Sequence, residues 1–218
     1  MEAVVWSDYL CPWCYVGRDR TAGIELLGVH AVSAPYELHP EIPPEGRPIR
    51  ADGRIAQVFD RIEAECDAAG RPFRRPTRVP NTRRALETAE VVRERSPLTF
   101  GALDDALFRA YFVEDLPLDD HDLLDELVAG AGASADEVRQ SVEAGDGHAA
   151  VNASMRRAHG AGVTATPAWL IDGRFVIPGV QPFETMQRWI LRLQTSSADQ
   201  HRPDATSIDQ PSSEAPSR

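Results

Sequence analysis

Two cysteines separated by two residues, Cys11 and Cys14, are the residues whose type and spacing could do chemistry. They follow a short β-branched and aromatic run and open a segment with helical spacing, so the pair stands at a strand-to-helix junction. A cysteine at a helix N-terminus faces unsatisfied N–H groups and the positive end of the helix dipole, which favour the thiolate. Cys14 lies about one turn further along, within reach of a mixed disulfide at Cys11. The spacing therefore predicts a redox-active dithiol in which Cys11 attacks and Cys14 resolves.

Two other interpretations of this cysteine pair carry less weight. A closed zinc site needs four ligands, and the third cysteine, Cys66, is isolated in a helical segment without a histidine at ligand spacing, so no metal site is predicted. A chance pair is disfavoured by the intervening Pro12 and Trp13 and by the strand pattern that precedes the pair. For Cys66 itself we expect an inert, packed side chain rather than a redox partner.

The order of strand and helix patterns places this pair in an α/β fold. Residues 3–8 and 29–38 read as strands, the second interrupted near Pro35, and residues 39–48 form a proline-rich loop without regular structure. From about residue 54 to residue 160 the pattern is helical throughout. The expected helices are residues 55–69, 82–95, 100–113, 123–130, 135–144 and 147–159.

Strand patterns return near the end of the chain. Residues 168–171 and 174–177 flank Asp172-Gly173, a pair typical of a type I′ hairpin turn, and residues 182–193 predict a closing helix. Pro167 precedes the first of these strands and could simply start it. After residue 195 the chain has almost no apolar anchors, so we expect a disordered tail.

Several stretches, in this order, resemble the DsbA-like family of FrnE-type cytoplasmic dithiol-disulfide oxidoreductases and isomerases, which have the thioredoxin fold. They are residues 7–17 around the Cys11-Pro12-Trp13-Cys14 motif, 36–40, 80–82, 106–112 and 162–182. The resemblance implies a thioredoxin-like core formed by residues 1–50 and 159–194, a large all-helical insertion over residues 51–158, and a tail over residues 195–218. One position departs from the family, because Leu86 stands where a histidine is common.

The resemblance also assigns roles to residues. It implies that Thr166-Pro167 is a cis-proline loop packed against the cysteines, where the Thr166 backbone pairs with an extended substrate. The expected activity is the exchange of disulfides in client proteins, with a thioredoxin-type protein or a low-molecular-weight thiol such as glutathione as reductant. No metal or organic cofactor is implied.

Two alternative functions stay open at this point. Relatives with the same fold use glutathione for transferase or isomerase chemistry on small aromatic molecules, as 2-hydroxychromene-2-carboxylate isomerase and kappa-type glutathione transferases do, but they place a serine where Cys11 stands. The third hypothesis is a non-catalytic, holdase-like module. Its binding surface would be the aromatic side chains near the cysteines, namely Trp13, Trp6, Tyr9 and Tyr15.

Composition limits the remaining partners. The 218 residues carry 23 basic and 34 acidic side chains, a net charge of −11, which disfavours nucleic acid as the main partner. The one local cation cluster runs from Arg71 to Arg78, and we interpret it as a solvated loop or as a contact for acidic clients and glutathione carboxylates. No apolar run reaches the roughly 20 residues of a membrane span. With no basic and apolar leader at the start, we expect a cytoplasmic protein.

Overall fold

A four-stranded mixed sheet forms the centre of the computed structural model, which describes residues 1–49 and 53–200. The strands follow the order β2-β1-β5-β6, with bounds β1 (Glu2–Ser7), β2 (His30–Pro35), β5 (Ala168–Ile171) and β6 (Phe175–Pro178). β1 pairs parallel with β2 and antiparallel with β5. A parallel pair needs a crossover, which is supplied by helix α1 (Pro12–Glu25). The predicted thioredoxin-like α/β core is therefore confirmed.

Alternation along the strands gives the sheet two apolar faces. On one face Val5, Trp169 and Ile177 pack beneath α1 and the last helix, α8 (Phe183–Gln200). On the opposite face Trp6 and Leu170 pack against α7 (Asp146–Gly160). Because neighbouring residues in a strand point to opposite sides, a short β-branched and aromatic run such as β1 serves both cores at once.

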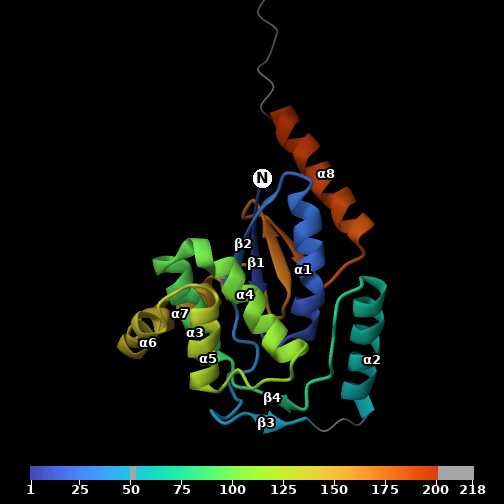
Figure 1. Cartoon of the computed structure of the whole chain (residues 1–218). Coiled ribbons are helices and arrows are strands. Elements are labelled where there is room, and N and C mark those ends of the chain that lie inside the picture. Colours follow the sequence, from blue (N-terminus) through green and yellow to red (C-terminus); the bar gives the residue numbers. More distant parts are fainter. Residues whose placement is uncertain (50–52, 201–218) are drawn as a thin grey trace, which may run out of the picture.

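The segment between β2 and β5 is the helical insertion, and its helices agree with the predicted ranges to within three residues at either end. They are α2 (Gly53–Ala68), α3 (Arg83–Arg95), α4 (Pro97–Phe112), α5 (His121–Gly130), α6 (Ala135–Ala144) and α7. α2 lies on one side of α1 and α4 on the other (Figure 1), so the insertion flanks the helix that carries the cysteines. α7 approaches α3 closely, since a Cβ at Gly147 would lie 2.5 Å from the Glu87 carbonyl oxygen.

A small two-stranded ladder corrects part of the sequence analysis. β3 (Arg47–Pro48) lies at the end of the loop expected to be irregular, and it pairs antiparallel with β4 (Arg78–Val79), inside the block expected to be wholly helical. Strands of two residues carry no periodicity, so no pattern predicts them. The ladder lies near the N-terminal end of α1 (Figure 1) and closes that side of the molecule.

The hairpin before α8 follows its prediction. Asp172 and Gly173 both have positive φ, 46° and 68°, and the Arg174 N–H donates to the Ile171 carbonyl at 3.0 Å, as a type I′ turn requires. α8 then continues to Gln200, so the disorder expected from residue 195 is wrong for the first six residues of that stretch. The rest of the expected tail, residues 201–218, lies outside the described residues.

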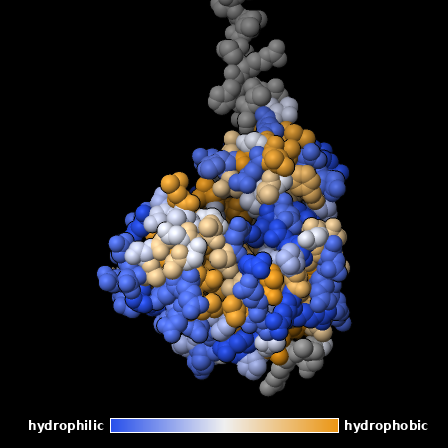
Figure 2. Space-filling view, in the orientation of Figure 1, coloured by the Kyte–Doolittle hydropathy of each residue, from blue (hydrophilic) through white to orange (hydrophobic). Residues whose placement is uncertain are grey.

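The surface is mostly hydrophilic on the face shown in Figure 2, where hydrophobic side chains form small separate groups. Within residues 1–49 and 53–200, no helix is both long and apolar enough to cross a bilayer.

Candidate active site

The Cys11-Pro12-Trp13-Cys14 motif begins α1 directly after β1. Cys11 is the N-cap residue, with extended backbone at φ −84° and ψ 111°, and Pro12 takes the first helical position, where its missing N–H costs nothing. The Cys11 N–H donates to the Asp8 carbonyl at 3.1 Å, and the Cys14 N–H donates to the Cys11 carbonyl at 3.0 Å. Both thiols are free and only 3% exposed. The predicted strand, cysteine pair and helix are confirmed in this order.

The Thr166-Pro167 loop lies against Cys11, and its peptide bond is cis, as the resemblance implies. The Cys11 thiol donates to the Thr166 carbonyl oxygen at 3.5 Å. Gly17 permits this approach, because a Cβ there would lie 3.2 Å from Pro167 Cγ. The Thr166 hydroxyl is buried and has no hydrogen-bond partner. Four of the six predicted site residues, the two cysteines and Thr166-Pro167, are thus brought together.

The pKa values of the two thiols move in opposite directions. Burial opposes ionisation of Cys11, but the side chains of Cys14 and Thr166, which stabilise the charged sulfur, outweigh burial and lower the Cys11 pKa. Burial raises the pKa of Cys14 well above its ordinary value, and both its hydrogen bond to Cys11 and the charge on Cys11 add to that rise. Cys11 is therefore suited to be the attacking thiolate, and Cys14 is held as a thiol.

A buried carboxylate, Asp8, supports the turn that presents Cys11. It is 0% exposed and accepts hydrogen bonds from the Leu38 N–H at 2.7 Å, the Thr82 hydroxyl at 2.7 Å and the Leu10 N–H at 3.3 Å. Burial raises the pKa of Asp8 to about 6 against these hydrogen bonds, and its charge in turn raises the pKa of Cys11. Sequence analysis identifies no role for Thr82 or Leu38 here, because the network joins segments up to 74 residues apart.

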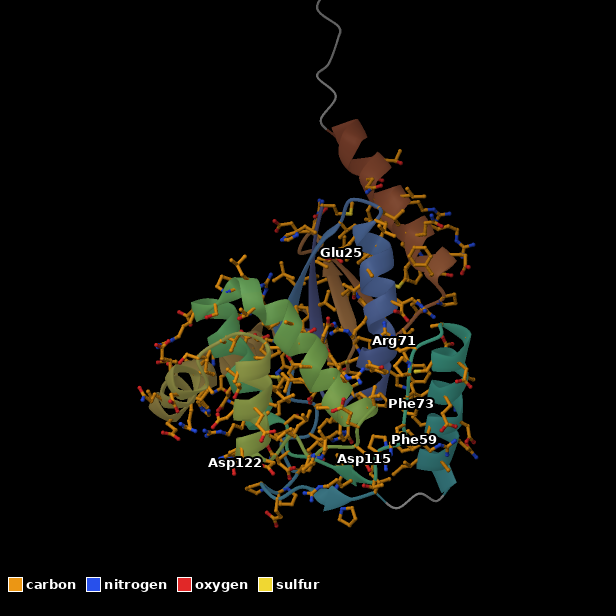
Figure 3. All side chains as sticks on the ribbon, in the orientation of Figure 1. Glu25, Phe59, Arg71, Phe73, Asp115 and Asp122 are labelled. Carbon is orange, nitrogen blue, oxygen red and sulfur yellow. The ribbon has the colours of Figure 1, made fainter. Side chains whose placement is uncertain are left out.

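Cys11 opens into a pocket of about 370 Å³, which we call the apolar pocket. Its other walls come from the loop after β2, from α2, from β4 and from the end of α4. Its apolar lining includes the side chains of Pro12, Leu38, Ile55, Val58, Phe59 and Phe112. Phe59, labelled in Figure 3 beside Phe73, packs against that ring with centroids 6.3 Å apart, so an aromatic cluster backs the pocket.

Cys14 opens into a different cavity, of about 290 Å³, which we call the polar cavity. Ser7, Arg18, Thr21 and Asp104 line it, and it extends to Glu25 at the far end of α1 (Figure 3). The two sulfurs therefore face different cavities. Cys11 faces a pocket with an almost wholly apolar lining, whereas the cavity beside Cys14 mixes hydroxyl and charged groups with apolar residues such as Phe108 and Trp169.

Trp13 lines a third cavity, of about 440 Å³, together with Arg20, Glu65 and the residues that lead into α8. The expected aromatic binding surface around Trp13 is wrong for its three other members, which are buried. Trp6 is fully buried in the sheet core, and Tyr9 and Tyr15 are 5% and 4% exposed.

The arginines near the site are held by carboxylates. Arg18 pairs with Asp104 and Asp105, and Arg20 with Glu65 at 3.0 Å. In the predicted cation cluster, Arg71 pairs with Asp19 and lies over the Tyr15 ring, Arg75 pairs with Asp60 and Glu63, and Arg78 pairs with Asp119. Because Arg71, Arg75 and Arg78 are paired with carboxylates of the same chain, the loop interpretation of this stretch is favoured over a role in binding acidic clients.

Cys66 and Leu86, both noted in the sequence, lie in the buried core. Cys66 is 1% exposed, and burial raises its pKa to about 11, which leaves it an unreactive thiol. Leu86 fills the core at 2% exposure, and His39 borders the apolar pocket. In the part of the chain that the structure describes, no group of three or more histidine, cysteine, aspartate or glutamate side chains is placed to hold a metal ion.

The sequence pattern that defines the DSBA-like thioredoxin domain family matches residues 3–190 of this chain. The chain belongs to the DsbA-like thioredoxin domain family. This DsbA-like chain is therefore a member of a family of thiol-disulfide oxidoreductases, which agrees with the resemblance seen in its motifs.

Three solved structures show how this DsbA-like fold recurs. A probable DsbA oxidoreductase from Streptomyces coelicolor is 28% identical, with a TM-score of 0.79 over 96% of this chain and 94% of that chain. The cytosolic disulfide reductase DsbM from Pseudomonas aeruginosa, solved with GSH, is 18% identical, with a TM-score of 0.65 over 91% of this chain and 100% of that one. A 2-hydroxychromene-2-carboxylate isomerase is 14% identical, with a TM-score of 0.72 over 93% and 100%. The last two share the fold alone.

Proposed function

We propose that this DsbA-like chain is a dithiol oxidoreductase that reduces or isomerises disulfides of client proteins through Cys11 and Cys14. The observation that carries the proposal is the position of Cys11 at the N-cap of α1, with its thiol 3.5 Å from the Thr166 carbonyl oxygen of the Thr166-Pro167 loop. The lowered pKa of Cys11 and the raised pKa of Cys14 support it. The Cys11 thiolate attacks a client sulfur, the client disulfide breaks, and a mixed disulfide forms with release of one client thiolate. Cys14 then attacks Cys11, which frees the second client thiolate and leaves an intramolecular disulfide.

The apolar pocket supports a polypeptide client. It begins at Cys11 and Pro12, so an apolar side chain close to the client cysteine would fill it while the sulfurs react. The backbone of Thr166, beside Cys11, would pair with the extended client as an added strand edge. Trp13 would bound the opposite side of the motif.

A reducing thiol must return the disulfide to the dithiol. We propose a thioredoxin-type protein or a low-molecular-weight thiol in a reducing, cytoplasmic environment, where reduction and isomerisation are favoured over net oxidation. The structural neighbour that was solved with glutathione, itself a cytosolic disulfide reductase, supports this choice.

A second candidate is a glutathione-dependent enzyme that acts on small aromatic molecules. The apolar pocket favours it, because about 370 Å³ beside the reactive sulfur accommodates one aromatic ring system. The retained Cys11-Cys14 pair favours the dithiol mechanism, since an isomerase of this second kind needs no resolving thiol.

Equilibration in glutathione redox buffers separates the two. The dithiol mechanism requires a reversible Cys11–Cys14 disulfide, seen by mass after thiol trapping, with a potential within the range of about −270 to −120 mV of known thioredoxin-fold oxidoreductases. Cys14→Ser should accumulate mixed disulfides with clients, and Cys11→Ser should lose turnover. A protein that forms only a glutathione adduct at Cys11 would contradict the dithiol mechanism and favour the second candidate.

A further inference from the structure

The last residue of β1, Ser7, stands beside the resolving thiol. Its carbonyl accepts from the Tyr36 N–H at 2.9 Å, which fixes the end of the strand, and its side chain shares the wall of the polar cavity with Cys14. The Ser7 side chain lowers the pKa of Cys14 against the burial that raises it. A hydroxyl therefore lines the same cavity as the sulfur that must become a thiolate.

The polar cavity continues into a smaller void of about 10 Å³, the size of one water molecule. Ser7, Ser33 and Asp104 line both spaces, and the small void also touches Tyr9 and the buried Glu90. Hydroxyl and carboxylate groups give a water molecule the partners it needs. Polar groups therefore line the space beside Cys14, among apolar residues such as Phe100.

The Thr166 hydroxyl is the second unexplained group at this point. It is buried without a hydrogen-bond partner, a costly arrangement for a polar atom, yet the Thr166 side chain favours the ionised form of both thiols. A partner for this hydroxyl exists once a sulfur in the motif carries a charge. In the reduced protein the Thr166 hydroxyl is therefore an unsatisfied donor near the two sulfurs, in addition to the Ser7 hydroxyl.

We propose that Ser7 is a catalytic residue of the resolving step, in which its hydroxyl donates a hydrogen bond to the Cys14 thiolate while the polar cavity carries the proton to solvent. This inference rests on the proposed dithiol function and adds a residue to it. The Thr166 side chain also favours the ionised form of Cys14.

The reaction balances as follows. In the mixed disulfide the Cys11 sulfur is bonded to the client and carries no charge. The hydrogen bond and the charge through which Cys11 raises the pKa of Cys14 are therefore both lost. Cys14 loses its proton to water in the polar cavity, its Sγ bonds to Cys11 Sγ, and the bond between Cys11 and the client sulfur breaks. The client leaves as a thiolate that takes up a proton, so the client sulfur is reduced and the protein dithiol is oxidised by two electrons.

A chromogenic aromatic disulfide, dithiobis(nitrobenzoate), isolates this step in the full chain. Attack by Cys11 releases the first coloured thiolate, and attack by Cys14 on the resulting mixed disulfide releases the second, so the slow second phase reports resolution. Stopped-flow traces are recorded across pH for the parent, Ser7→Ala, Ser7→Thr and Ser33→Ala. Ser33 is the matched control, because it lines the same two cavities from β2 and is likewise partly buried.

We expect Ser7→Ala to slow the second phase about tenfold relative to the first, since a hydrogen bond to a charged group is lost, and to move its pH midpoint upward by about one unit. Ser7→Thr should restore the ratio, and Ser33→Ala should keep it. Unchanged phases in Ser7→Ala, or equal slowing of both phases, would overturn the assignment of Ser7. Absence of a second phase in the parent would instead refute the dithiol function itself.

Discussion

The Thr82 hydroxyl donates a hydrogen bond of 2.7 Å to the buried Asp8 carboxylate. Thr82 is the N-cap residue of α3, yet its side chain makes no capping bond to its own helix. The hydroxyl that would ordinarily stabilise the helix N-terminus is used instead to join the insertion to the turn that presents Cys11. The start of α3 and the reactive thiol are thus fixed by one carboxylate.

This relationship predicts a pH dependence of stability. Burial raises the pKa of Asp8 from its ordinary 3.8 to about 6, so between these values the native state binds the proton and the unfolded chain does not. Stability of the parent therefore falls as pH rises through this window and is constant above it. Asp8→Asn lacks this titration, so its stability relative to the parent should improve by about 2 kcal/mol from pH 4 to pH 7.

Urea unfolding of the two reduced proteins at several pH values measures this difference. The sign is the informative part, because a carboxylate stabilised by its three donors would give the opposite trend. Parallel stability curves for parent and variant would show that Asp8 titrates normally in the folded protein.

Removal of the Cys14 thiol should make Cys11 less acidic. Although burial is the largest influence on Cys11, the hydrogen bond from the Cys14 side chain is the largest one that lowers the Cys11 pKa. In Cys14→Ala the Cys11 pKa should therefore rise, which the pH dependence of alkylation by iodoacetamide detects. Cys66→Ala is the control, and the pH dependence of Cys11 alkylation in this variant should match that of the parent protein. A Cys11 pKa that stays or falls in Cys14→Ala would contradict the interaction.

Gly17 should tolerate no side chain without movement of the Thr166-Pro167 loop. A Cβ there would lie 3.2 Å from Pro167 and 3.3 Å from the Trp169 ring, both of which are fixed in the core. We expect Gly17→Ala to destabilise the fold by about 1–2 kcal/mol, as overpacking of a core does, and to slow attack by Cys11. Gly101→Ala in α4 meets no atom within 4 Å and should stabilise by up to about 1 kcal/mol. Thermal unfolding of both variants tests the contrast, and equal effects would rule out the steric argument.

The apolar pocket should determine which client peptides react fastest. Ile55 lines the pocket and is 45% exposed, whereas Leu191 on α8 lies outside it and is 48% exposed. Ile55→Ser should reduce the preference for a disulfide peptide with leucine beside the cysteine over one with serine, by roughly threefold to tenfold. Leu191→Ser removes a similar side chain at similar exposure and should keep the preference. Competition between the two peptides, followed by mass spectrometry, gives the ratio, and an equal loss in both variants would show that the pocket does not select.

The sequence predicts what local pattern encodes. The Cys11-Pro12-Trp13-Cys14 motif, the strand before it and the six insertion helices each have a periodicity or a punctuation of their own, and the cis bond before Pro167 came from a resemblance. The Asp8 network, the β3–β4 ladder and the division into two cavities depend on residues far apart in the chain, such as Asp8 and Thr82. The sequence also did not predict that Trp6, Tyr9 and Tyr15 are all buried, because the residue type alone does not say whether an aromatic side chain near a motif faces water or the core.

The two cavities described on either side of the motif make client recognition and proton release separable by engineering. Substitutions in α2 reshape the space in front of Cys11, while the groups behind Cys14 belong to β1, β2, α1 and α4. Under the proposed function, we therefore expect a library restricted to the α2 face to change which disulfides react without altering the ionisation of Cys14.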